Sequence, residues 1–272
     1  MMEKKYIYEA EVVSNTEAAP GIMKMEMSAP EAAAQALPGQ FINIYPKADR
    51  LILPRPVSIC SADASEGSMT LVYAVVGRGS EEMSRMKKGD MIRISSPLGN
   101  GFPEPAEGRK NVLLVSGGVG TAPMVFMARH LMDRGLDVTA VTGFRKDPVL
   151  TEELRQAGCR VLVTTEIPDE EAFVGNVIDC MDVNEIRPDD SWVCYSCGPK
   201  PMLKAVYRYL TDISDGADIY VSLEERMGCG YGACVGCVVD IKTPAGEGGE
   251  MATVKKKVCK DGPVFRGWEV FS

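Results

Sequence analysis

The sequence predicts a multi-domain protein of three parts: an antiparallel β-barrel or sandwich, a Rossmann-like parallel α/β region, and a small cysteine-rich C-terminal region. Short β-rich runs separated by Pro, Gly and polar turns occupy residues 1–101, which is typical of a small all-β unit. Apolar runs then alternate with helical stretches through residues 102–222, as in parallel sheets with crossover helices. Four of the nine cysteines fall within residues 223–272. We therefore expect three domains with these boundaries.

The N-terminal region contains six predicted strands and one short predicted helix, over residues 80–86. Each strand is a short β-rich run bounded by Pro, Gly or polar turns, and strands at this spacing favour a barrel or a sandwich. The predicted strands are Tyr6–Val13, Gly21–Met27, Gln40–Tyr45, Val57–Ser61, Met69–Val76 and Met91–Ser95.

The central region changes to a βα pattern after the prolines at 103 and 105. The apolar strand Asn111–Val115 leads through a glycine turn into the helix Thr121–Arg134. Further buried strands are predicted at Val138–Thr142, Val161–Thr164, Trp192–Tyr195 and Ile219–Ser222. In the last part of the chain, Val235–Lys242 and Met251–Val258 are expected to pair as a hairpin.

Composition excludes several classes of function. The net charge of −8 argues against nucleic-acid binding, which needs Lys and Arg to neutralise phosphates. No stretch approaches the roughly 20 apolar residues that a membrane span requires, and the first residues lack the pattern of a signal peptide. We expect a cytoplasmic protein that does not bind membranes. The single histidine, His130, excludes metal sites that need several His ligands.

The cysteines near the C-terminus follow the spacing C-x₄-C-x₂-C, and 21 residues separate the last of these from a fourth cysteine. This spacing is typical of plant-type [2Fe–2S] sites. Glycines at 230, 232 and 236 allow a tight loop in which backbone N–H groups approach the sulfurs. A structural Cys₄ zinc site is the alternative, although it usually has two separated C-x₂-C pairs. The predicted ligands are Cys229, Cys234, Cys237 and Cys259.

A flavin signal lies between two predicted strands, in the segment Arg55-Pro56-Val57-Ser58. It resembles the Arg-x-(aromatic)-Ser motif of the ferredoxin reductase superfamily, with Val57 in place of the aromatic residue. The planar fork of Arg55 suits a pyrophosphate, and the Ser58 hydroxyl can hydrogen-bond the edge of a flavin ring. The plainer alternative is an ordinary strand with a proline at its edge.

A second signal in the same region is a glycine turn at residues 77–80 that leads into the short predicted helix. Free N–H groups at a helix N-terminus bind phosphate, and the helix dipole adds about 0.3–1 kcal/mol. Gly79 and Ser80 are therefore expected to contribute to the flavin site.

Two further turns suggest a dinucleotide site in the α/β region. Gly117, Gly118 and Gly120 lie between a predicted strand and a helix, but Pro123 stands where the usual motif has its third glycine. The turn is therefore either a phosphate site or a purely structural βα turn. Arg145 follows the second strand where an acidic residue would hold a ribose diol, so NAD and NADP are not distinguished.

The segment Cys197-Gly198-Pro199 follows a predicted strand and opens a helix. Ligands bind at the carboxyl ends of parallel strands, so Cys197 is predicted to face the contact between nicotinamide and flavin. The alternative is a buried thiol, because free cysteines are usually buried. The same reasoning assigns Cys60, Cys159, Cys180 and Cys194 to core packing.

With these signals in this order, the chain resembles the electron-transfer subunits of type 1B dihydroorotate dehydrogenase over essentially its whole length. The most specific segments are 222–230 and 258–265, and Ser80 departs from the Thr common in that family. The resemblance implies a β-barrel that binds FAD, an NAD domain and a [2Fe–2S] domain. The implied FAD residues are Arg55, Pro56, Val57, Ser58, Val72, Tyr73, Ala74, Gly79 and Ser80.

The resemblance also implies a partner and a direction of electron flow. The partner is a separate FMN-containing catalytic subunit that oxidises dihydroorotate, in a 2+2 heterotetramer. Electrons would pass from the partner through the cluster and FAD to NAD⁺, as part of pyrimidine biosynthesis. Ser58 and Cys197 are the expected catalytic residues because they would lie closest to the hydride-transfer step.

Two other functions fit part of the same pattern. One is a stand-alone NAD(P)H-dependent ferredoxin or flavin reductase of the same superfamily. The other is a non-catalytic sensor or a zinc-stabilised binding module with a reductase-like fold. Flavin and iron–sulfur bands in a visible spectrum would favour an electron carrier, whereas a colourless zinc protein would favour the module.

Overall fold

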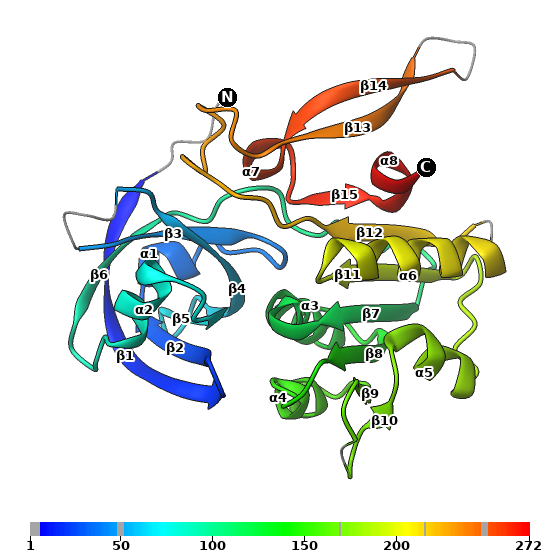
Figure 1. Ribbon diagram of the computed structural model, residues 1–272, viewed down its shortest axis with the longest axis horizontal. Coiled ribbons are helices and arrows are strands. Elements are labelled where there is room, and N and C mark those ends of the chain that lie inside the picture. Colours follow the sequence, from blue (N-terminus) through cyan, green and yellow to red (C-terminus); the bar gives the residue numbers. More distant parts are fainter. Residues whose placement is uncertain (1–5, 48–51, 169, 215, 246–249) are drawn as a thin grey trace.

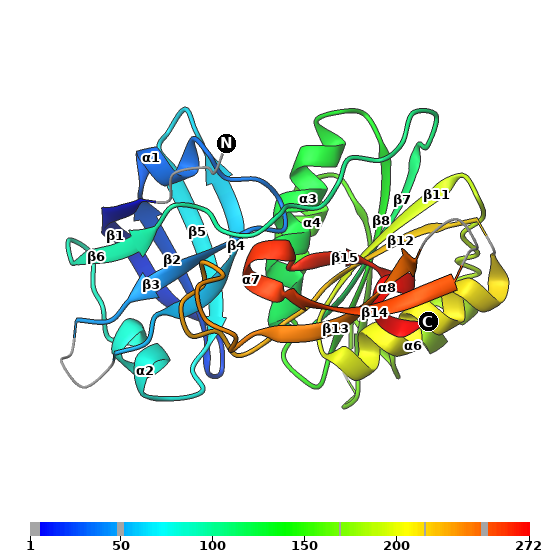
Figure 2. The same ribbon diagram turned by 90° about the horizontal axis from the view of Figure 1, so that it is seen from above.

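The computed structural model describes residues 6–47, 52–168, 170–214, 216–245 and 250–272. A β-barrel and an α/β unit lie side by side, and the C-terminal segment runs across both (Figures 1 and 2). None of the helices in the described ranges combines the length and the apolar character that a bilayer crossing needs.

The N-terminal unit is a closed antiparallel barrel with the strand order β1-β2-β5-β4-β3-β6. This confirms the predicted barrel and excludes the sandwich. Alternate residues of each strand point inward, as Met23, Met25 and Met27 do on β2, and these side chains form the barrel core. The strands are β1 (Ile7–Ala19), β2 (Ile22–Ser28), β3 (Phe41–Tyr45), β4 (Arg55–Asp63), β5 (Ser68–Ala74) and β6 (Met91–Ser95).

Two short helices accompany the barrel. The helix α2 (Arg78–Ser84) begins two residues before the predicted start, because Gly77 occupies the N-cap position. The helix α1 (Pro30–Ala33) was not predicted, since it comprises only four residues. Strand β1 continues well beyond Val13, because its second half pairs with β2 in a hairpin that closes at Ala19 and Ile22.

The α/β unit is a sheet with the order β10-β9-β8-β7-β11-β12-β15. Strands β7 to β12 are parallel neighbours, as predicted. The central strand β7 is buried on both faces: Val112 and Leu114 pack towards α3 and α4, whereas Leu113 and Val115 pack towards α5 and α6. The strands are β7 (Asn111–Gly117), β8 (Asp137–Phe144), β9 (Arg160–Thr165), β10 (Phe173–Val174), β11 (Trp192–Cys197) and β12 (Asp218–Ser222); the helices are α3 (Thr121–Met132), α4 (Thr151–Gln156), α5 (Val177–Val183) and α6 (Lys200–Ile213).

The C-terminal segment ends in the α/β unit, which the sequence did not indicate. Strand β15 pairs antiparallel with β12, so it covers what would otherwise be an open edge of the sheet. The sheet is therefore mixed rather than wholly parallel. The remaining elements are the predicted hairpin β13 (Val238–Ala245) and β14 (Glu250–Lys257), then α7 (Val258–Asp261), β15 (Val264–Arg266) and α8 (Gly267–Phe271).

A shared apolar core joins the barrel to the α/β unit. Cys60 and Val72 of the barrel belong to the same cluster as Val112 of β7 and Met124 of α3. Across the surface of this contact, the Lys24 Nζ lies 2.9 Å from a carboxylate oxygen of Glu153. Because the two units share a packed core, groups bound to each would be held at a fixed separation.

Candidate functional site

The two predicted flavin segments meet at the start of α2. Arg55 opens β4, and its Nη1 donates a hydrogen bond to the Leu53 carbonyl at 2.7 Å. The guanidinium lies directly against Gly79, so any side chain at position 79 would collide with it. The absence of a side chain thus allows the planar donor group of Arg55 to lie beside the first turn of α2, an arrangement that suits a pyrophosphate.

The hydroxyl of Ser80 is used within the turn. It accepts hydrogen bonds from the N–H groups of Val76 at 2.9 Å and Gly77 at 3.1 Å, and it donates to the Gly77 carbonyl at 2.9 Å. Ser80 therefore fixes the shape of the glycine turn, and with it the position of the neighbouring Gly79.

The other predicted flavin residues line neighbouring strands of the barrel. Pro56, Val57 and Ser58 are half-buried on β4, where Val57 and Ser58 pair with residues of β3. On β5, Val72 and Tyr73 are buried while Ala74 is half-buried. The Tyr73 hydroxyl donates to the Asn15 side-chain oxygen at 3.2 Å. Burial, only partly offset by that bond, raises the pKa of Tyr73 to about 12.

The predicted dinucleotide turns also meet, because β7 and β11 are neighbours in register, with Ser116 opposite Cys197. A Cβ atom at Gly120 would lie 2.5 Å from the Cys197 carbonyl oxygen, and one at Gly117 would lie 3.0 Å from Pro199. These two glycines allow the turns to touch. Gly118 differs, because its φ of +56° is left-handed and a Cβ there would meet no atom within 4 Å.

Cys197 ends β11 at this meeting point and is half-buried. Burial of its sulfur raises the pKa of the thiol to about 12, although a hydrogen bond with Ser222 opposes the shift. The group is therefore a neutral thiol at physiological pH, which cannot act as a nucleophilic thiolate. It can still donate a weak hydrogen bond beside a bound ring.

The four predicted cluster cysteines lie in two pairs. We call residues 227–237 the cluster loop. Within it the thiols of Cys229 and Cys234 hydrogen-bond one another, and the buried thiols of Cys237 and Cys259 form a second hydrogen-bonded pair. Gly232 has a φ of +79° and gives its N–H to Cys259, so the left-handed glycine turns the backbone donor towards a sulfur.

Backbone donors surround the sulfur of Cys229. The N–H groups of Tyr231 and Cys234 each point at it from 3.4 Å. Burial raises the pKa of this thiol, but hydrogen bonds from Cys234, Tyr231 and Ala233 outweigh burial and lower it to about 6. At Cys259, burial and the bond with Cys237 instead raise the pKa to about 12.

This arrangement fits a two-iron cluster better than a single ion. Across the described parts of the chain, no group of three or more His, Cys, Asp or Glu side chains is placed to hold one metal ion. A zinc ion would need all four thiolates around one centre. In a [2Fe–2S] cluster, four thiolates serve two irons, so two thiol pairs joined by one loop match the donor set.

Residues far away in the sequence hold the cluster loop. The Nζ of Lys257 donates to the Gly232 carbonyl at 2.5 Å, and the side-chain amide of Asn43 donates to the Cys229 carbonyl at 3.0 Å. By contrast, Lys255 makes an exposed ion pair with Asp240 at 3.0 Å. The run Lys255-Lys256-Lys257 on β14 therefore includes one side chain that faces solvent and one that holds the cluster loop. Sequence reasoning missed Asn43, since no local pattern marks it.

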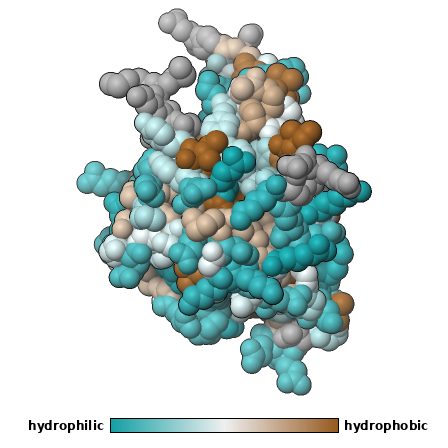
Figure 3. Space-filling model, turned by 90° about the vertical axis from the view of Figure 1, so that its left-hand side faces the viewer, coloured by the Kyte–Doolittle hydropathy of each residue, from teal (hydrophilic) through white to brown (hydrophobic). Residues whose placement is uncertain are grey.

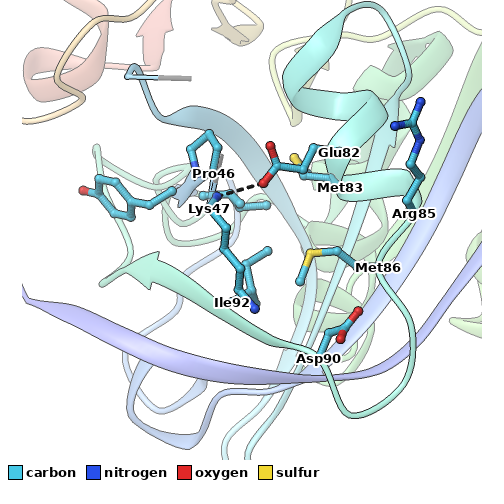
Figure 4. A pocket seen from close by; sticks show the side chains of 10 residues that line it. Pro46, Lys47, Glu82, Met83, Arg85, Met86, Asp90 and Ile92 are labelled. Carbon is cyan, nitrogen blue, oxygen red and sulfur yellow. Dashed lines mark hydrogen bonds between the residues drawn. The ribbon is translucent and has the colours of Figure 1, made fainter. Parts of the chain in front are cut away.

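A separate pocket of about 270 Å³ lies between the end of β3, the C-terminal end of α2, and β6 (Figure 4). Met86 and Ile92 contribute apolar walls, and the backbone N–H of Lys47 donates to a Glu82 carboxylate oxygen at 2.8 Å. None of the predicted cofactor residues lines this pocket. It is therefore not the site that the motifs build.

Two family models match the chain. One describes the iron–sulfur cluster binding domain of dihydroorotate dehydrogenase B and matches residues 224–271. The other describes an oxidoreductase FAD-binding domain and matches residues 7–102. The first range contains all four paired cysteines, and the second contains Arg55 and Gly79.

Curated relatives agree over nearly the full length. The dihydroorotate dehydrogenase B (NAD(+)) electron transfer subunit of Listeria innocua is 38% identical over 270 residues, covering 96% of this chain and 98% of the relative. The subunit of the same name from Bacillus caldolyticus is 40% identical over 236 residues, covering 86% of each chain.

Solved structures share the architecture. A chain of an NADH-dependent reduced ferredoxin-NADP oxidoreductase superposes with a TM-score of 0.79 at 32% identity, covering 96% of this chain and 88% of that one. A ferredoxin NADP⁺ reductase from Neisseria gonorrhoeae, solved with FAD and NADP, gives a TM-score of 0.66 at 17% identity, covering 76% and 91%. The second likeness concerns the fold alone.

Proposed function

This chain belongs to the family of dihydroorotate dehydrogenase B electron transfer subunits, and we propose that it passes electrons from a catalytic partner through a [2Fe–2S] cluster and FAD to NAD⁺ in pyrimidine biosynthesis. The main support for the proposal is that the predicted cluster, flavin and dinucleotide sites all lie in one packed structure. The paired cysteines lie against the barrel, the barrel presents Arg55 beside Gly79, and the barrel shares its core with the sheet that carries the glycine turns.

The proposal assigns the residues as the sequence indicated, within domains 1–101, 102–222 and 223–272. The cysteine pairs supply the thiolates of the cluster. The FAD set is Arg55, Pro56, Val57, Ser58, Val72, Tyr73, Ala74, Gly79 and Ser80; the NAD set is Gly117, Gly118, Gly120, Cys197, Gly198 and Pro199.

A flavin exchanges two electrons with a nicotinamide and single electrons with an iron–sulfur cluster. FAD would therefore connect the two-electron chemistry of NAD⁺ with the one-electron chemistry of the cluster. The chain's own residues provide binding and orientation. Arg55 would neutralise the pyrophosphate, and the Ser58 hydroxyl would hydrogen-bond the ring edge. Gly118 leaves open space for the dinucleotide, while Cys197 keeps its proton and presents a neutral, polarizable surface.

The partner in this proposal is an FMN-containing catalytic subunit in a 2+2 assembly. Three large apolar side chains support a covered surface beside the cofactor motifs: Ile52 is 90% exposed, Val76 88% and Val235 75%. Figure 3 shows the side of the molecule that carries the barrel, where several hydrophobic patches lie among mainly hydrophilic residues. Burial of these apolar side chains under a partner would favour the assembly. A cytoplasmic location is supported by the nine cysteines, all within the described ranges, because none of them forms a disulfide bond.

A second candidate is a subunit of a ferredoxin-NADP oxidoreductase. The 32% identity to that enzyme over 96% of this chain favours it. The two functions share the same cofactor sites and differ in the protein that exchanges electrons with the cluster.

The test uses the purified chain, first alone and then mixed with the FMN subunit encoded by the same organism. Alone it should contain iron, sulfide and FAD, reduce an artificial dye with NADH, and leave dihydroorotate untouched. The mixture should reduce NAD⁺ with dihydroorotate. A colourless zinc protein would refute the electron-transfer role. A chain that holds its cluster and FAD, but does not reduce NAD⁺ with dihydroorotate in the mixture, would favour the second candidate.

A further inference from the structure

The strand β3 contacts both the proposed flavin strand and the cluster loop. Along one edge, Asn43 and Ile44 pair with Pro56 and Arg55 of β4. The side-chain amide of Asn43 donates to the Cys229 carbonyl. A single strand therefore touches both the flavin motif and a cluster ligand.

Asn43 is completely buried, which is unusual for a polar side chain that belongs to no predicted motif. Its backbone N–H donates to the Ser95 hydroxyl at 2.9 Å, and its side-chain oxygen has no hydrogen-bond partner among the residues that the structure describes. The amide lies against Gly230, where a side chain would collide with it and where φ is +76°. The loop and the strand thus fit together at the level of the backbone.

A second contact lies beside the first. The hydroxyl groups of Tyr45 and Tyr231 hydrogen-bond across the same junction at 2.5 Å, and Ser95 also bonds Tyr231. The backbone N–H of Tyr231 donates to the Cys229 sulfur at 3.4 Å. The phenol pair therefore fixes the residue whose N–H reaches a cluster ligand.

We propose that Asn43, Tyr45 and Tyr231 are positioning residues that fix the cluster loop on β3 and thereby set the cluster potential and its separation from the flavin. The inference rests on the proposed function, because it concerns the same cluster. Hydrogen bonds to the sulfurs raise the potential by stabilising the reduced, more negative cluster. A loosened Tyr231 would weaken one of these bonds and so lower the potential.

The test compares Tyr45→Phe, Tyr231→Phe and the double variant in the complete protein. Each single variant should lower the ratio of reduced to oxidised cluster roughly tenfold at a fixed potential, which corresponds to about 59 mV for one electron. The double variant should shift the potential no further than Tyr231→Phe, because that single change already removes the bond to Tyr45 as well as the bond to Ser95. The potential is measured by redox titration followed by electron paramagnetic resonance, and hydrogen exchange should accelerate in the cluster loop.

Tyr209→Phe is the matched control, since its hydroxyl donates to Asp182 at 2.8 Å and accepts from Arg187 at 2.7 Å in the α/β unit. It should leave the cluster potential unchanged. Iron loss from both single variants but not from the control would also support the proposal.

Unchanged potential and unchanged loop exchange in both single variants would overturn it, as would a double variant that shifts the potential twice as far. In that case the proposed function stands, provided that the unmodified chain holds its cluster and FAD. If the unmodified chain holds no cluster, both the proposed function and the role of these three residues are refuted.

Discussion

At the scale of single residues, Gly79 decides where Arg55 can lie. The guanidinium fills the volume that a side chain at position 79 would need. A substitution there displaces the donor group without removing it. This makes position 79 an independent test of the role given to Arg55.

We expect Arg55→Ala and Gly79→Ala to weaken FAD binding by a similar amount, roughly 1.5–3 kcal/mol, which is the range for hydrogen bonds to charged groups. Titration of the FAD-free protein with FAD measures the effect. Arg85→Ala is the control, because Arg85 lies at the C-terminal end of α2 beside the separate pocket. Equal FAD affinity in Arg55→Ala and the unmodified chain would remove Arg55 from the site.

The cysteine pairs give a second prediction at this scale. Cys237→Ser should abolish or strongly reduce cluster content, because it leaves one iron with a single thiolate. Cys180→Ser removes an equally buried thiol of α5 and should retain the cluster. Iron and sulfide analysis distinguishes the two. A fully loaded Cys237→Ser protein would contradict the assignment.

The buried thiol of Cys60 predicts a pH dependence of stability. Burial, reinforced by the charge of Glu153, raises the pKa of Cys60 to about 12, above the unfolded value of roughly 8.5. Its contribution is therefore fully present below about pH 8.5 and is lost as the pH rises towards 12. Within that window each such thiol lowers the free energy of unfolding by about 1.4 kcal/mol per pH unit.

Cys60→Ala should remove the contribution of this thiol to the pH dependence of the free energy of unfolding. Urea unfolding at pH 8 and pH 10 measures it, as the difference between the two pH values for each protein. An identical difference in the variant and the unmodified chain would show that Cys60 ionises equally in the folded and unfolded states.

Residue roles differ in how far the sequence reveals them. The spacing of Cys229, Cys234 and Cys237 is local, so these cysteines can be proposed as ligands without a structure. Asn43 and Tyr45 meet residues almost two hundred positions away, and such pairs leave no pattern in a single sequence. The hydrogen bonds by which the Ser80 hydroxyl holds its turn also leave no pattern in the sequence.

At the scale of elements, the longer strands and helices follow from hydrophobic patterns, whereas the short ones do not. The strand β10 has two residues and α1 has four, which is too few for a periodic signal. The strand β15 has three residues and exists through its pairing with β12, over forty residues earlier. Its antiparallel direction could not be inferred from the βα alternation.

The glycine turn after β7 allows the two interpretations left open by the sequence to be separated. Gly120→Ala places a Cβ against the Cys197 backbone, so it should lower the melting temperature. Gly118→Ala meets open space and costs about 1–2 kcal/mol for its left-handed φ. It should raise the KM for NADH while bound FAD stays in place.

The measurements are thermal unfolding and NADH-dependent dye reduction on both variants. If Gly118→Ala leaves the KM for NADH unchanged, the turn is structural only. If both variants also lose FAD, the substitutions have disturbed the barrel through the apolar core that it shares with the α/β unit.

At the scale of the whole molecule, the cluster loop must lie at a surface that a partner can reach. Val235 stands between Cys234 and Cys237, two of the proposed cluster ligands, and is 75% exposed. A partner that covered the cluster loop would bury this apolar side chain, and that burial would favour binding. The partner subunit is therefore expected to bind over the cluster loop.

Val235→Glu should weaken the complex with the FMN subunit at least tenfold, because it places a charge in an apolar contact. Cluster content and NADH-dependent dye reduction by the chain alone should not change. Val183→Glu is the control, since Val183 is 66% exposed on α5 of the α/β unit, away from the cluster loop (Figure 1). Size-exclusion chromatography and titration calorimetry of the two subunits measure the affinity. Equal loss of affinity in both variants would point to a general effect of added negative charge, and no loss in Val235→Glu would place the partner on another face.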